Sequence, residues 1–352
     1  MTAAIETLAF AGELPWHKLG KSVSSDLGWT EMIKEAGLDW TVSLRKLFVR
    51  RPTDEVSFQL VPDYFSVVRD SDSSVLGVVG KKYTPIQNRD SFRFLDTMAG
   101  DLKYETAGAL LGGRVVFALA RLDQGDFAVD DHGDDQVQMY LLLANRHDGS
   151  GAFVTRLTTV RVVCMNTLTA ALTEDGNQFR IFHTSQEAKR IDMEAETAAA
   201  FLGLVQRKQD VLQQYMRALT AGKGDDSMLS TFLDEMLPLP VDEDPSKQLL
   251  NNRDGLKEWY FDGPGQDLAT ARGTAWGLLN AATGWSTHLK SIRVQGGTAI
   301  LEEEGEAAYE AAKVETRMKS ALLGGEGSIA GFGFRALEFL KQRVPVSVVA
   351  EA

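Results

Sequence analysis

Apolar and polar residues alternate with two different periods along this chain, and the period changes near residue 184. Before that point, short runs rich in β-branched and aromatic residues are separated by Gly, Asn, Asp and Ser clusters, a pattern typical of strands. Gly112-Gly113 indicates a hairpin turn. The strands we expect are Val42–Val49, Ser57–Val61, Tyr64–Arg69, Val75–Val79, Lys103–Leu111, Arg114–Arg121, Val137–Ala144, Ala152–Val162 and Gln178–His183.

Helical periodicity dominates the rest of the chain. Apolar residues recur at a spacing of about 3.6 from Ser185 to Leu219, which predicts one long amphipathic helix. Further helices are expected at Met228–Met236, Leu249–Tyr260, Leu268–Leu289, Glu304–Leu323 and Phe332–Gln342, and earlier ones at Trp29–Ala36, Asn88–Gly100 and Cys164–Leu172.

The order of these elements predicts the fold class. Strands come first and helices later, so we expect an α+β protein with a β-rich N-terminal half, a few helices within it, and a mainly α-helical C-terminal half. The predicted domains are a strand-rich core domain over residues 1–184 and a helical region over residues 185–352.

Composition places the chain among ordinary globular proteins, with 44% hydrophobic and 24% charged residues. No apolar run approaches the roughly 18 residues that cross a bilayer, and the N-terminus lacks the pattern of a secretory signal. The single cysteine, Cys164, excludes an internal disulfide and any site built from several cysteines. We therefore expect a cytoplasmic protein that has no contact with a membrane.

The net charge of −12 argues weakly against nucleic acid as a partner. The acidic residues are concentrated, however, in one loop from Asp123 to Asp135 and in a tract from Asp225 to Asp267. Basic residues are frequent elsewhere, so the charge distribution leaves an anionic partner open.

Several familiar kinds of site are missing from the sequence. No glycine-rich loop leads into Gly-Lys-Ser or Gly-Lys-Thr, and the glycines at 108, 112 and 113 do not form a dinucleotide fingerprint. The five histidines are scattered and never have the spacing of a helical zinc site. We predict neither a metal nor a cofactor.

The stretch Asn145–Leu168 carries the densest polar chemistry. His147 and Asp148 are either an acid–base pair or part of a turn in which Asp148 bonds its own backbone and Gly149 takes a positive φ; the turn is favoured. Cys164 is either a nucleophile, with His147 or His183 as its base, or a buried core residue, which is favoured. Asn166 caps the local helix or binds a ligand.

Arg161 is the residue of this stretch that most needs a partner. It lies inside an apolar strand, where an unpaired guanidinium is costly. We expect it to pair with a carboxylate, to cap carbonyl groups or to face a bound anion, with a structural ion pair and phosphate binding equally expected. Arg146 and Arg156 lie nearby in the sequence, so the region is cationic.

Five segments, taken in order, resemble a family of phage- and plasmid-like proteins that carry a domain of unknown function. They are Pro15–Gly20, Tyr83–Asn88, His147–Ser150, Arg161–Leu168 and Thr274–Ala281, with Arg317–Ala321 extending the match over nearly the whole chain. Where that family usually has a Tyr and an Asp-His pair, this chain has Gly284–His288. The resemblance implies a mobile-element origin. The strand-then-helix order and this context are also similar to phage single-strand annealing recombinases of the Red-beta type.

We therefore expect a phage-type recombination protein that binds single-stranded DNA, forms a homo-oligomer and promotes strand annealing without nucleotide hydrolysis. The residues expected to contact phosphate are Arg114, Arg146, Arg156 and Arg161, supported by Lys81, Lys82 and Arg89. One alternative is a hydrolase or nuclease with a polar site of His147, Asp148, Cys164 and Asn166. Another is a phage protein that acts on host defence through protein contacts.

Overall fold

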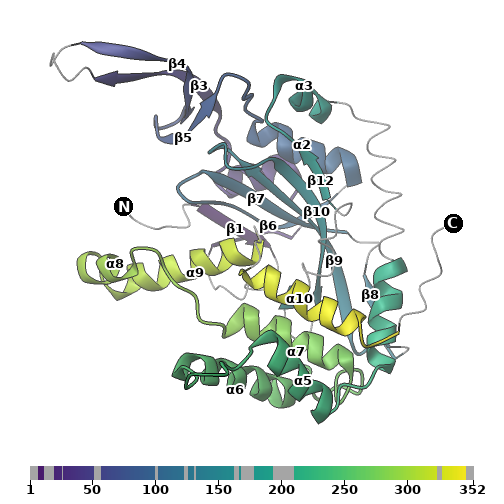
Figure 1. The fold of residues 1–352 in the computed structure, drawn as a ribbon. Coiled ribbons are helices and arrows are strands. Elements are labelled where there is room, and N and C mark those ends of the chain that lie inside the picture. The colour runs from purple at the N-terminus through teal and green to yellow at the C-terminus, as the bar shows by residue number, and fades with distance from the viewer. Residues whose placement is uncertain are drawn as a thin grey trace.

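The structure is a computed structural model that describes residues 7–11, 20–25, 27–50, 57–99, 102–122, 126–130, 132–161, 166–167, 178–192, 210–322 and 327–345. It has a β-rich N-terminal half and helices mostly from residue 185 onward, so the predicted α+β class is confirmed. Figure 1 shows a large central sheet, a small sheet that projects above it, and a group of helices below.

The large sheet has nine strands among the described residues, in the order β11-β10-β9-β7-β6-β1-β2, with β12 beside β10 and β8 beside β9. All pairings are antiparallel except β1 with β2. Its strands are β1 (Thr7–Ala11), β2 (Lys21–Val23), β6 (Lys103–Leu110), β7 (Val115–Arg121), β8 (Phe127–Ala128), β9 (Gln136–Arg146), β10 (Phe153–Arg161), β11 (Asn166–Thr167) and β12 (Gln178–Ile181).

The small sheet has the order β3-β4-β5. Its strands are β3 (Val42–Arg50), β4 (Phe58–Arg69) and β5 (Val75–Gly80). The two strands expected at 57–61 and 64–69 form the single strand β4, because a bulge near Asp63, whose φ is 63°, carries the chain past Pro62 without ending the ladder.

The helices are α1 (Trp29–Glu35), α2 (Asn88–Ala99), α3 (Ser185–Ala188), the 3-10 helix η2 (Lys189–Asp192), a helix over 210–221, α5 (Asp226–Met236), α6 (Lys247–Asp262), α7 (Ala275–His288), α8 (Gly297–Glu303), α9 (Glu306–Leu322) and α10 (Ile329–Lys341). Side-chain oxygens of Asp225, Ser246, Thr274 and Ser328 cap the N-termini of α5, α6, α7 and α10.

Three predicted helices differ from the structure. The helix expected over Ser185–Leu219 changes at Lys189 into a 3-10 helix, and 193–209 lies outside the described residues. The helix expected from Leu268 begins only at Ala275, after turns that let Thr274 act as its cap. Within the expected helix Cys164–Leu172, Asn166 and Thr167 form a strand because they pair with Arg161 and Val160; the other residues of that helix are not described.

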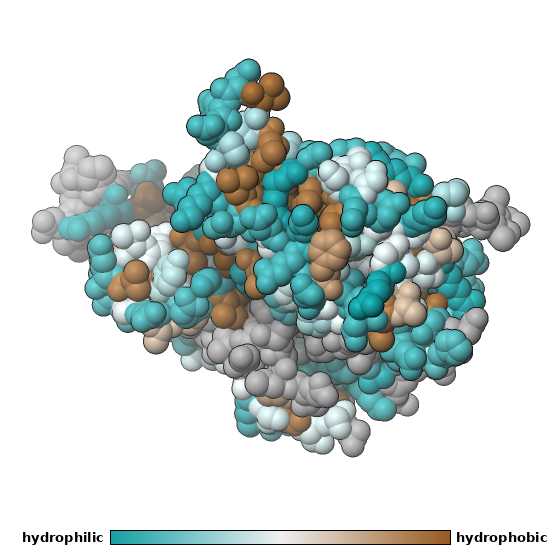
Figure 2. All heavy atoms as spheres, turned by 90° about the horizontal axis from the view of Figure 1, so that it is seen from below, coloured by the Kyte–Doolittle hydropathy of each residue, from teal (hydrophilic) through white to brown (hydrophobic). Residues whose placement is uncertain are grey.

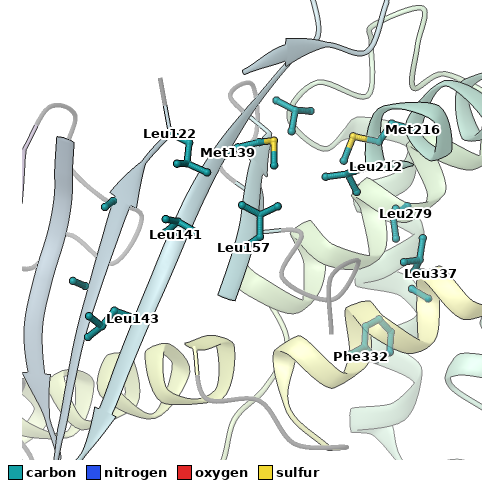
Figure 3. Close-up of a cluster of buried hydrophobic side chains, with 14 of the residues drawn as sticks. Leu122, Met139, Leu141, Leu143, Leu157, Leu212, Met216, Leu279, Phe332 and Leu337 are labelled. Carbon is teal, nitrogen blue, oxygen red and sulfur yellow. The ribbon is translucent and has the colours of Figure 1, made fainter. Parts of the chain in front are cut away.

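One hydrophobic core joins the sheet to the helices below it. Met139 and Leu141 of β9 belong to the same buried cluster as Leu212, Leu279 of α7 and Leu337 of α10, and Figure 3 shows these side chains between the two layers. The strand-rich and helical parts therefore depend on each other for burial of apolar surface. The domain boundary at residue 184 stays a prediction.

A buried carboxylate adds a polar contact between these two parts. Asp135, at the start of β9, is inaccessible to solvent and accepts hydrogen bonds from Thr270 Oγ1 at 2.6 Å and from Trp276 Nε1 of α7 at 2.9 Å. Because buried polar groups need partners, this arrangement fixes the position of α7 relative to the sheet.

Candidate functional site

The register of three neighbouring strands brings arginines to one face of the large sheet. Leu142 of β9 lies opposite Arg156 of β10, and Ala144 lies opposite Val154, which in turn lies opposite Arg180 of β12. Side chains of residues paired directly across two strands point to the same side of the sheet. Side chains two positions apart along one strand do so as well. Arg146, two residues after Ala144, therefore shares this face with Arg156 and Arg180.

A pocket of about 340 Å³ lies on this face, and all three arginines line it. Arg146 Nη1 donates a hydrogen bond of 3.1 Å to Ser150 Oγ on the turn that follows β9. Phe182 contributes an aromatic ring and is 57% exposed. The complete lining is Leu142, Ala144, Arg146, Ser150, Gly151, Ala152, Val154, Arg156, Arg180 and Phe182.

The electrostatics of the pocket favour an anion. Arg156 is only 9% exposed, and burial together with the positive charge of Arg146 lowers the pKa of Arg156 to about 10, so the group still carries its charge near pH 7. Among the described residues, neither Arg146 nor Arg180 forms an ion pair with a carboxylate. An anion in the pocket would reduce the repulsion between these cations.

The opposite face of β9 carries neutral polar groups that pack against α2. The Asn145 amide donates to Ile86 O at 2.9 Å and to Ser91 Oγ at 3.1 Å. His147, which is fully buried, places Nε2 at 2.8 Å from Oδ1 of Asn88. Burial, and to a lesser degree His183, lowers the pKa of His147 to about 3, so the imidazole is neutral at physiological pH.

The segment after β9 is the predicted turn. Asp148 Oδ1 accepts a hydrogen bond of 2.9 Å from the Ser150 backbone N, and Gly149 has a φ of 76°, which confirms this reading. The turn packs on β5, because a Cβ on Gly77 would meet Asp148 O at 2.6 Å. His147 contacts Asn88 whereas Asp148 contacts its own backbone, so the two side chains make separate interactions.

The segment before α2 supports the same turn. The Tyr83 hydroxyl donates to Arg146 O at 3.2 Å, and its ring stacks on that of His183 at 4.8 Å between centroids. Burial lowers the pKa of His183 to about 4, so this histidine is also neutral near pH 7. The end of β9 at Arg146 is therefore held by Tyr83, whose ring in turn packs on a buried, neutral histidine.

None of the other predicted cations whose side chains the structure describes lines this pocket. Arg114 is exposed on the turn before β7, and its carbonyl accepts from His147 N. Lys81 pairs with Asp63 at 3.2 Å and Arg89 with Asp39 at 2.8 Å, while Lys82 is exposed. The side chains of Arg161, Cys164 and Asn166 lie outside the described residues.

Sequence reasoning missed two members of the pocket, Arg180 and Phe182. Their alternate spacing within the predicted strand Gln178–His183 indicated that both point to one side. The missing information was the partner strand, because the pairing of β12 with β10 depends on tertiary structure.

A metal site and a membrane-spanning helix are both absent from the described part of the chain. There, no group of three His, Cys, Asp or Glu side chains is arranged to hold a metal ion. No helix in the same residues has both the length and the apolar character needed to span a bilayer.

Comparison with known proteins identifies the family. Residues 75–315, which include every residue of the pocket, match the family described as "Domain of unknown function (DUF932)". The chain belongs to the DUF932 family. No curated protein and no solved structure matches it.

Proposed function

We propose that this DUF932 protein binds single-stranded DNA, with backbone phosphates in the pocket of Arg146, Arg156 and Arg180, and that it promotes annealing of complementary strands without nucleotide hydrolysis. The observation that carries the proposal is that three arginines from neighbouring strands line one pocket. Guanidinium forks match phosphate oxygens in geometry and charge.

The exposed ring of Phe182 beside these cations supports a single strand over a duplex. A base in a single strand can leave its neighbours and stack on an aromatic face, and such stacking tolerates any sequence. Proteins that hold single strands without reading their sequence combine phosphate contacts with stacked bases. Arg146 and Arg180 would supply the phosphate contacts here, and Phe182 would stack on a base. The mobile-element context rests on the resemblance of the sequence to phage- and plasmid-like proteins. The annealing step rests on the similarity of the element order and of this context to phage single-strand annealing recombinases.

The test is annealing of two complementary oligonucleotides, one with a fluorophore and one with a quencher. The protein should accelerate annealing at low salt without added nucleotide, and Arg180→Gln should reduce that acceleration. Arg272→Gln is the matched control, because Arg272 is an exposed arginine that does not line the pocket. An unaccelerated reaction at low salt would show that the annealing proposal is wrong.

The enzyme alternative loses the support of a His–Asp pair, because His147 and Asp148 contact different partners. Its third member, Cys164, lies outside the described residues, so a cysteine nucleophile stays a prediction. Action through protein contacts on host defence also stays a prediction.

A further inference from the structure

Strands β3 and β4 extend beyond the edge strand β5 as a two-stranded ribbon, defined here as residues 47–50 and 58–61. The last pair between β4 and β5 on this side joins Tyr64 to Gly80, whereas β3 and β4 continue to pair as far as Arg50 and Phe58. Figure 1 shows the ribbon projecting from the body of the molecule.

One face of this ribbon combines large apolar side chains with positive charge. Phe48 lies opposite Leu60 and Arg50 lies opposite Phe58, so these four side chains point to the same side. Phe48 is 52% exposed, Phe58 is 65% exposed and Leu60 is 43% exposed. Lys46, also exposed, precedes them on β3.

The apolar side chains of this face are exposed to solvent in a single copy. An isolated two-stranded ribbon is marginally stable in water, and clustered exposed apolar residues mark interaction surfaces. Aromatic residues and Arg are also the residues most enriched where proteins bind one another.

A complementary surface lies on the connection between α5 and α6. Its seven residues, Pro238–Asp244, are all exposed and read Pro-Leu-Pro-Val-Asp-Glu-Asp. Val241 is 94% exposed and Leu239 is 44% exposed. Leu239 and Val241 of this segment match the exposed apolar side chains of the ribbon, and its three acidic residues complement Lys46 and Arg50 in charge.

These two surfaces cannot meet within one chain. Figure 1 places β3 and β4 at the top of the molecule and α5 and α6 at the bottom, with the large sheet between them. We propose that the ribbon of one copy binds the Pro238–Asp244 segment of a second copy. Because every copy carries both surfaces, two copies can pair reciprocally as a closed dimer, or successive copies can join head-to-tail as a ring or a filament.

Figure 2, which views the molecule from below, shows a mainly hydrophilic surface with separate apolar patches. On that side, the exposed apolar residues Leu239 and Val241 precede a run of three acidic residues. This patch therefore carries negative charge, opposite to the positive charge of the ribbon.

The first experiment measures self-association of the full chain by sedimentation velocity over a concentration series. Phe48→Ser with Phe58→Ser should weaken association by about tenfold or more, because exposed aromatic anchors dominate interface energies. Val75→Ser with Val78→Ser is the matched control: these valines are 57% and 52% exposed on β5 of the same sheet, away from the ribbon. A wild-type chain that stays monomeric at every concentration would overturn the proposal.

The second experiment exchanges charges between the two surfaces. Lys46→Glu with Arg50→Glu makes the ribbon acidic, and Asp242→Lys with Asp244→Lys makes the segment basic, so each variant alone should remain monomeric through like-charge repulsion. An equimolar mixture should associate again, because every contact between unlike variants then joins opposite charges. A mixture that stays monomeric would contradict the pairing of the ribbon with the Pro238–Asp244 segment. Ribbon variants that associate like the wild type but no longer bind single-stranded DNA would also contradict it, and would show that the ribbon binds nucleic acid instead.

Discussion

Arg146 of β9 and Arg156 of β10 line the same pocket, and burial together with the charge of Arg146 lowers the pKa of Arg156 to about 10. Two like charges beside each other destabilise the protein in the absence of a counter-ion. With Arg180 on the neighbouring strand, the sheet concentrates positive charge at one place in a chain whose net charge is −12.

Small phosphate anions should stabilise the protein through this pocket. Pyrophosphate at a hundredfold excess over its dissociation constant should add about 2.7 kcal/mol to the free energy of unfolding. Thermal melts with pyrophosphate, against chloride at equal ionic strength, measure this effect. Arg180→Gln should lose most of the gain, and an equal gain in that variant would place the anion elsewhere.

The two buried histidines should make the protein sensitive to mild acid. Burial lowers the folded-state pKa of His147 to about 3 and of His183 to about 4, from 6.5. Below pH 6.5 the histidines of the unfolded chain bind protons, whereas those of the folded chain stay neutral. The free energy of unfolding is therefore highest above pH 6.5 and decreases as the pH falls toward 4. Each histidine should lower the free energy of unfolding by about 2 kcal/mol when the pH falls from 6.5 to 5.

Urea unfolding at pH 7, 6 and 5 measures that loss. Neither ring nitrogen of His183 has a well-formed hydrogen bond among the described residues, so His183→Phe should fold and should roughly halve the pH dependence. His132→Phe is the control, because His132 is exposed, and it should leave the pH dependence unchanged. A full wild-type pH dependence in His183→Phe would rule out this origin.

Asp135 should be essential for attachment of the helical layer. Asp135→Ala leaves Trp276 Nε1 and Thr270 Oγ1 buried without this acceptor, which should cost about 3 kcal/mol or more in the free energy of unfolding. Asp134→Ala, at the exposed neighbouring position, should change stability by less than about 0.5 kcal/mol. Equal denaturation midpoints for the two variants would contradict this role.

A substitution at Gly77 tests whether β5 supports the turn at Asp148. In Gly77→Ala the new Cβ meets Asp148 O at 2.6 Å, so β5 and the turn must separate. We expect lower stability and weaker binding of single-stranded DNA, since Arg146 directly precedes that turn and Ser150 lies on it. Gly80→Ala is the matched control on the same strand, because its Cβ meets nothing within 4 Å. Identical melting temperatures and DNA affinities would show that the contact is unimportant.

The sequence predicted elements well where their periodicity is local. α5 and α6 carry clear helical patterns, and both were expected within a few residues of their observed bounds. The expected helix from Leu268 failed because residues 268–274 have helical composition but form the turns that precede the Thr274 cap. The strand at Asn166 was missed because the segment from Cys164 to Leu172 was predicted as a helix, although Asn166 pairs with Arg161 only five residues earlier.

The same reasoning applies to the candidate site. Arg146 and Arg156 were predicted as phosphate contacts from their cationic neighbourhood, and the strand register brings them together. Arg180 could not be added, because no local signal places β12 beside β10. The turn at Asp148 was predicted correctly, since an Asp-Gly turn depends only on its own backbone and side chain.

The most direct test of the arginine pocket is the salt dependence of DNA binding. Fluorescence anisotropy of a labelled oligo(dT) should give a linear fall of log K with log salt, and each pocket arginine removed should reduce that slope by about 0.7. We predict that Arg146→Gln and Arg180→Gln each weaken binding and flatten the slope, whereas Arg272→Gln retains wild-type values. Absence of binding at low salt, or unchanged affinity and slope in both pocket variants, would contradict the account.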